Sequence, residues 1–96
     1  MKKIAFQANL AVTFLREGKQ FVAYAPALDL STSGQTLEQA KKRFAEAVQI
    51  FFEECQRLGT LLEVLVDLGW QKGKNTLTPP AVVAQDYQQF RVPLTV

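Results

Sequence analysis

The segment from Leu37 to Leu58 constrains the fold most, because its apolar residues recur at intervals of three and four. That spacing places them on one face of an α-helix. Thr36 and Gln39 have the spacing of a capping box, in which the threonine hydroxyl accepts a hydrogen bond from the glutamine amide. Gly59 then ends the helix, since glycine readily adopts the left-handed conformation. Such a helix spans roughly 33 Å, enough to cover one face of a small sheet.

Alternating apolar residues before this helix predict three antiparallel strands. The first is expected over residues 4–15, and the pair Glu17-Gly18 is typical of a two-residue hairpin turn. With that turn Phe14 would face Phe21, so the apolar faces of the first two strands would coincide. A third strand is expected over residues 28–33, where leucine and threonine alternate with polar residues.

The chain after Gly59 is expected to add a short helix, a loop and a strand. Leucine-rich residues 61–68 indicate the helix, and the polar residues 71–80, punctuated by Gly and Pro, indicate the loop. Phe90, Val92 and Leu94 alternate with polar residues or proline, which predicts a C-terminal strand. Pro93 has no amide hydrogen, so this strand belongs at an edge of a sheet.

Together these elements predict an α+β fold with the order β-β-β-α-α-β. It comprises a three-stranded antiparallel meander, one long helix packed on one face, a short second helix and a C-terminal edge strand. The 96 residues are expected to form a single domain, 1–96. Its core is assigned to residues 1–59, and residues 60–96 contribute the short helix, the loop and the edge strand.

The composition argues against catalysis and predicts no cofactor and no metal site. The chain has no histidine and one cysteine, Cys55, which is expected to be a small core residue. No Asp or Glu occurs between Met1 and Arg16, so the first expected strand offers no carboxylate for a catalytic metal site. We therefore expect no enzymatic activity, and a residual hydrolase is the least favoured alternative.

The charge distribution gives little support to nucleic-acid binding. The net charge of +2 resides in residues 1–35, while 36–58 and 59–96 are each balanced. Proteins that bind phosphate backbones usually cluster their cations, and here only Lys2, Lys3 and Lys19 are candidate contacts. No apolar stretch approaches the ~18 residues of a membrane span, so we expect no membrane partner and a cytoplasmic location.

The expected C-terminal edge strand is the candidate interaction site. An edge strand presents unpaired backbone groups, which a second chain can use by adding a strand. We therefore expect self-association to a dimer or tetramer through Phe90, Val92 and Leu94. Trp70 is either a partner anchor of the same interface or a core residue, and the sequence leaves both interpretations open.

The segment from Phe21 to Phe51 resembles the HicB-like antitoxin family. The resemblance lies in Phe21-Val22-Ala23-Tyr24-Ala25-Pro26-Ala27-Leu28, in Gly34-Gln35-Thr36-Leu37-Glu38-Gln39-Ala40 and in Glu46-Ala47. It implies a partial ribonuclease-H-like fold and a non-catalytic protein that neutralises a small HicA-like ribonuclease. Many members add a DNA-binding module after this core, and residues 59–96 are expected to lack one. The alternatives are a homo-oligomeric interaction protein without a toxin partner and a weak nucleic-acid binder.

Overall fold

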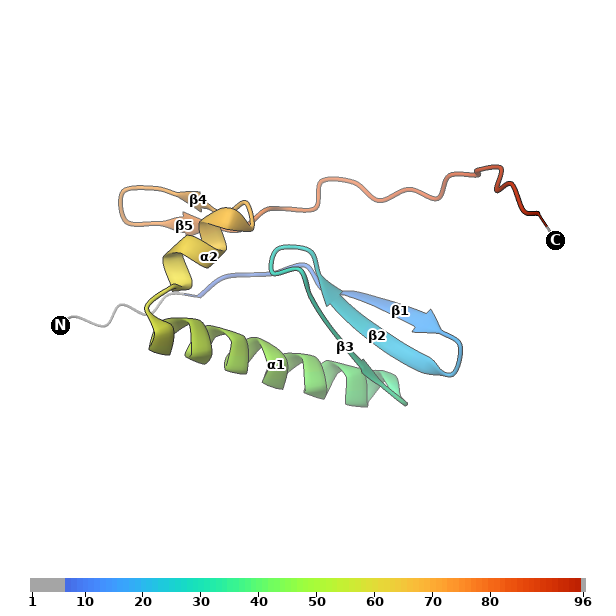
Figure 1. Ribbon diagram of the computed structural model, residues 1–96, viewed down its shortest axis with the longest axis horizontal. Coiled ribbons are helices and arrows are strands. Elements are labelled where there is room, and N and C mark those ends of the chain that lie inside the picture. Colours follow the sequence, from blue (N-terminus) through green and yellow to red (C-terminus); the bar gives the residue numbers. More distant parts are fainter. Residues whose placement is uncertain (1–6, 96) are drawn as a thin grey trace.

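The computed structural model describes residues 7–95, and it confirms the α+β class (Figure 1). Strands β1 (Thr13–Glu17), β2 (Gln20–Ala25) and β3 (Leu30–Gly34) form an antiparallel sheet in the order β1-β2-β3. Helix α1 (Leu37–Leu58) lies along the sheet, and the short helix α2 (Leu61–Asp67) follows it. Two short strands, β4 (Gln71–Lys72) and β5 (Leu77–Thr78), pair as a separate hairpin.

Helix α1 has the bounds and the caps that the sequence predicts. The amide of Gln39 donates to Thr36 Oγ1 at 3.0 Å, and Gly59 ends the helix with a φ of 71°. Gln39 Oε1 reaches back to the amide of Gln35 at 2.6 Å. These contacts satisfy amides that a helix terminus otherwise leaves without partners.

The turn between β1 and β2 lies one residue later than expected. Gly18 and Lys19 form it, Glu17 pairs with Gln20, and Gly18 has a φ of 61°. A glycine at the first position of a two-residue turn suits the type II′ geometry, which requires positive φ there. The predicted register was therefore wrong by two residues: Phe14 faces Ala23, not Phe21. A shift of two residues leaves every side chain on its predicted face.

The first strand is also shorter than predicted. It begins at Thr13, residues 7–12 are not in a strand, and residues 4–6 of the expected strand lie outside the described part of the chain. Thr13 already pairs with Tyr24, one residue before the end of β2, so earlier residues have almost no partner strand left. Leu10 instead packs against the core cluster that contains Leu65.

The core consists of two apolar clusters. Ala23, Ala25 and Phe44 fill the space between the sheet and α1. Ala27, Leu28, Leu65 and Trp70 form the second cluster, which joins α2 to the turn that follows β2. The residues of β2 in the first cluster are alanines, which lets the helix lie close to the sheet.

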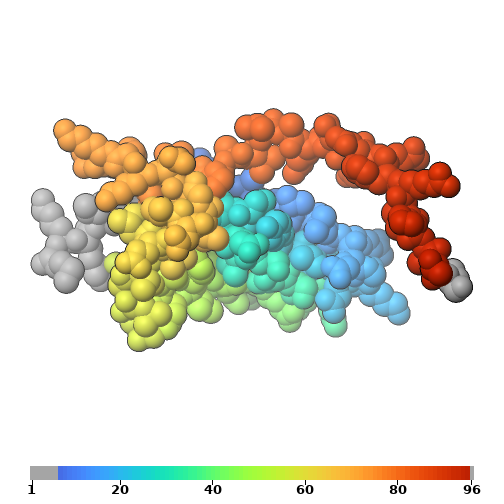
Figure 2. All heavy atoms as spheres, turned by 45° about the horizontal axis from the view of Figure 1, so that its top comes forward, coloured from blue at the N-terminus to red at the C-terminus, as the bar shows by residue number. Residues whose placement is uncertain are grey.

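The expected C-terminal edge strand is absent. Residues 79–95 have no secondary structure, and the pairing after α2 occurs in the β4–β5 hairpin, within the segment expected to be a loop. A strand requires a neighbour for its backbone groups; residues 90–95 have none among the described residues. They continue an extended segment that runs outside the body in Figure 2. The radius of gyration is accordingly 16.6 Å, against about 12.5 Å for a compact chain of this length.

Candidate functional site

The residues predicted as an interface lie on a projecting segment, which we call the C-terminal arm (residues 79–95). Phe90, Val92 and Leu94 are 77%, 78% and 82% exposed, and every residue from 81 to 95 is exposed. Large apolar side chains are rarely left in water over such a length, and runs of this kind mark interaction segments. The arm therefore brings these three residues together on one accessible segment.

Trp70 does not belong to that segment, and its burial argues against the partner-anchor interpretation. Its side chain is 3% exposed, and Nε1 donates a hydrogen bond to the carbonyl oxygen of Ala27 at 2.8 Å. The indole packs with Leu65 and Leu28 in the second core cluster. Of the two interpretations that the sequence allowed, the structure shows the core residue.

The outer edge of β1 is the second accessible backbone surface. Within residues 7–95 β1 pairs with β2 alone, so its other side carries amide and carbonyl groups without a strand partner. The outer edge of β3 differs, because Arg43 of α1 donates from Nη1 to the carbonyl oxygen of Ser33 at 3.1 Å. Helix α1 therefore protects one edge of the sheet and leaves the other accessible.

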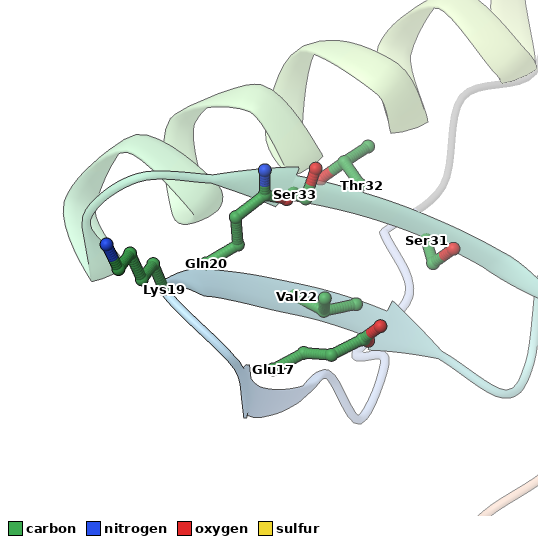
Figure 3. Close-up of a pocket in the computed structure, with 7 residues that line it drawn as sticks. All are labelled: Glu17, Lys19, Gln20, Val22, Ser31, Thr32 and Ser33. Atoms are coloured by element: carbon green, nitrogen blue, oxygen red, sulfur yellow. The ribbon is translucent and has the colours of Figure 1, made fainter.

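Only one of the three candidate nucleic-acid contacts lies in the described part of the chain. Lys2 and Lys3 lie outside the described part of the chain, and Lys19 occupies the exposed β1–β2 turn. Lys19 lines a shallow hollow of about 620 Å³ on the sheet face opposite α1 (Figure 3). Glu17 lines the same hollow, together with neutral polar side chains and Val22, so its two charged side chains balance.

The loop after β2 is held by Asp29. Tyr24 donates its hydroxyl to Asp29 Oδ1 at 3.0 Å, and this hydrogen bond raises the pKa of Tyr24. Asp29 has a φ of 48°, in the left-handed region that aspartate tolerates better than most residues. The carboxylate therefore has an intramolecular partner that fixes the turn at the end of β2.

A feature that the sequence analysis missed is an acidic helical surface formed by α1 from Phe44 onward and by α2. Residues 44–70 contain five acidic residues and one arginine, a net charge of −4. Dividing the chain at residues 36 and 59 concealed this excess, because Lys41, Lys42 and Arg43 were counted with the same helix. The acidic residues are all exposed: Glu46, Glu53, Glu54, Glu63 and Asp67.

Exposed aliphatic residues are interspersed with these carboxylates. They are Ile50, Leu58, Leu62 and Val66, which are 64%, 59%, 43% and 46% exposed. Arg57 forms an ion pair with Glu54, and Gln49 donates to Glu53 Oε1 at 2.9 Å, so both bonds stay within α1. The hydrogen bond to Glu54 raises the pKa of Arg57.

The described residues contain no group of three His, Cys, Asp or Glu side chains that could hold a metal ion. Cys55 is half-buried on α1. Over the same part of the chain, no helix has the length and apolar character needed to cross a membrane. Comparisons with protein-family models, with curated proteins and with solved structures found no match.

Proposed function

We propose that this chain is a non-catalytic protein-binding module of the HicB antitoxin type, which neutralises a small basic ribonuclease by binding it. The observation that carries the proposal is the acidic helical surface, with a net charge of −4 over residues 44–70 in a chain of net charge +2. The resemblance of residues 21–51 to the HicB-like family supports it. That segment comprises most of β2, all of β3 and most of α1.

The chemistry of this surface suits a basic partner. A ribonuclease needs cationic side chains to bind the phosphate backbone of its substrate. A protein surface that presents carboxylates to those side chains would exclude RNA from them. Complementary charge also speeds encounter with the correct partner. The exposed Ile50, Leu58, Leu62 and Val66 supply apolar area that such an interface can bury between its charged groups.

The test is whether a small basic protein is encoded next to this chain, binds it and is inhibited by it. We would co-purify the two proteins, measure the affinity by calorimetry and follow RNA cleavage with and without this chain. Glu46→Lys/Glu63→Lys changes two exposed positions of the acidic helical surface. Glu17→Lys/Asp86→Lys makes the same charge change elsewhere on the molecule and is the matched control.

We expect the first pair of substitutions to weaken inhibition by more than about tenfold and the control pair by less than about threefold. Circular dichroism should show that both variants remain folded. A neighbouring protein without ribonuclease activity would overturn the antitoxin proposal. Equal effects of the two variants would show that the acidic helical surface is not the binding surface.

A further inference from the structure

The outer edge of β1 has a defined hydrogen-bonding pattern. Because the carbonyl of Ser33 bonds to Arg43, it points away from β2. Backbone groups alternate sides along a strand, so the residues of β3 that face β2 are 30, 32 and 34. Following the observed pairs across the sheet, residues 13, 15 and 17 of β1 face β2. The backbone groups of Phe14 and Arg16 therefore point outward at the accessible edge.

The arm has a complementary pattern, set by Pro93. Proline lacks an amide hydrogen, so the side of an extended arm that carries residues 91, 93 and 95 has an interrupted row of donors. Phe90, Val92 and Leu94 present their amides on the other side, where the row is complete. The arm can therefore pair with a sheet edge only through the side that carries the backbone amides of Phe90, Val92 and Leu94.

Antiparallel pairing would place these apolar side chains against the apolar face of the sheet. In an antiparallel ladder, residues that exchange hydrogen bonds have their side chains on the same face. Phe14 has that orientation: it pairs with the buried Ala23, and the Lys41 ammonium of α1 lies 5.6 Å from its ring centroid. Phe14 is 39% exposed, so an added strand has apolar surface to cover.

The arm runs past its own sheet without pairing with it (Figure 1). Pro79 and Pro80 stiffen its base, and no glycine follows Gly73, so the sequence provides no flexible turn for the arm to fold back. In Figure 1 the arm runs in the same sense as β1, whereas antiparallel pairing with its own β1 would require a reversal. A second copy can present the edge in the required orientation without any such reversal.

The exposed area is large enough for a stable dimer. The chain exposes 8496 Å², whereas a folded monomer of this mass typically exposes about 5,500 Å². The excess is roughly 3,000 Å², and a typical stable protein interface buries about 1,600 Å² in total. Reciprocal exchange of two arms is a closed, two-fold arrangement, so it would not propagate into fibres.

We propose that the arm of one copy adds as an antiparallel strand to the outer edge of β1 in a second copy, and reciprocally. Leu94, Val92 and Phe90 then lie opposite Val12, Phe14 and Arg16 of the other chain. The proposal concerns self-association and is independent of the antitoxin function. It predicts a dimer of two 10.8 kDa chains, joined through two equivalent strand pairs.

Sedimentation of the full chain over a range of concentrations tests the dimer, and proline substitution tests the strand pairing. Val92→Pro removes an amide on the pairing side and should raise the dimer dissociation constant more than about tenfold. Gln89→Pro removes an amide on the side already interrupted by Pro93, and Val92→Thr keeps the amide. Both controls should change the dissociation constant by less than about threefold. Trp70 fluorescence will show that the core is intact in each variant.

Disulfide trapping shows whether the pairing is between chains. In a Cys55→Ser background, Phe14→Cys in one chain and Val92→Cys in another should form a disulfide heterodimer on oxidation. Opposite residues of a hydrogen-bonded antiparallel pair lie about 5.5 Å apart, within disulfide range. A wild-type chain that is monomeric at all concentrations would overturn the proposal. A dimer that is unaffected by Val92→Pro, or one that fails to cross-link, would also overturn it.

Discussion

At the level of single residues, Trp70 connects the two ends of the second core cluster. Its indole amide bonds to the carbonyl of Ala27, which is 43 positions away in the sequence. This contact joins the end of α2 to the turn after β2, and Ala27 and Leu28 are buried against the ring. The sequence could not assign this role, because nothing local to residue 70 identifies a partner so distant along the chain.

Replacement of Trp70 should therefore cost stability and leave association unchanged. Trp70→Ala removes a 97% buried side chain, and it should lower the free energy of unfolding by about 3–5 kcal/mol. Trp70→Phe keeps an aromatic ring but leaves the Ala27 carbonyl without its donor, at a cost of about 1–3 kcal/mol. Urea denaturation followed by circular dichroism measures both values. Tyr87→Phe, in the exposed arm, is the control and should change nothing. A stable Trp70→Ala variant that no longer dimerises would restore Trp70 as an interface residue.

At the level of elements, the sequence predicted what local signals determine. The bounds of α1 follow from Thr36, the apolar stripe and Gly59, all of which lie within or next to the helix. The β1–β2 turn lies one residue later than predicted, because Gly18 can occupy either position of a two-residue turn. The prediction of a strand at residues 90–96 was wrong for residues 90–95. Alternation indicates a strand, but it does not supply the neighbouring strand with which that segment must pair.

The contact between β3 and α1 depends on Gly34. A Cβ at this position would lie 2.7 Å from the backbone nitrogen of Ala40, and backbone cannot move aside as a flexible side chain can. Gly34→Ala should therefore lower the free energy of unfolding by about 3 kcal/mol, at the upper end of the effect of overpacking. Gly18→Ala meets no atom within 4 Å, and its positive φ alone should cost about 1 kcal/mol.

Chemical denaturation of both alanine variants distinguishes steric overlap from backbone strain. Each variant adds one methyl group, but Gly18→Ala introduces only backbone strain and Gly34→Ala only steric overlap, so the two losses report the two effects separately. Equal losses in the two variants would mean that β3 and α1 can separate slightly at little cost. A smaller loss for Gly34→Ala than for Gly18→Ala would contradict the close packing seen at Ala40.

At the level of the whole molecule, three surfaces could be predicted from the sequence to different degrees. Alternation alone singled out Phe90, Val92 and Leu94, and the structure places them on the exposed arm, which is not paired within the described part of the chain. The acidic helical surface was missed, because division of the chain at residues 36 and 59 split the acidic segment 44–70 and counted part of it with Lys41, Lys42 and Arg43. The accessible edge of β1 required the strand order and the bond from Arg43 to Ser33.

The arm should contribute to stability through association alone. Residues 84–95 are exposed, so a chain that ends at Val83 should unfold within about 0.5 kcal/mol of the full chain under dilute, monomeric conditions. The melting temperature of the full chain should rise with protein concentration, since a dimer is stabilised by mass action. That of the shortened chain should not rise. Thermal melts at two concentrations about a hundredfold apart measure both effects. A shortened chain that melts earlier when dilute would mean that the arm packs on its own body, and a concentration dependence that survives the truncation would place the dimer interface elsewhere.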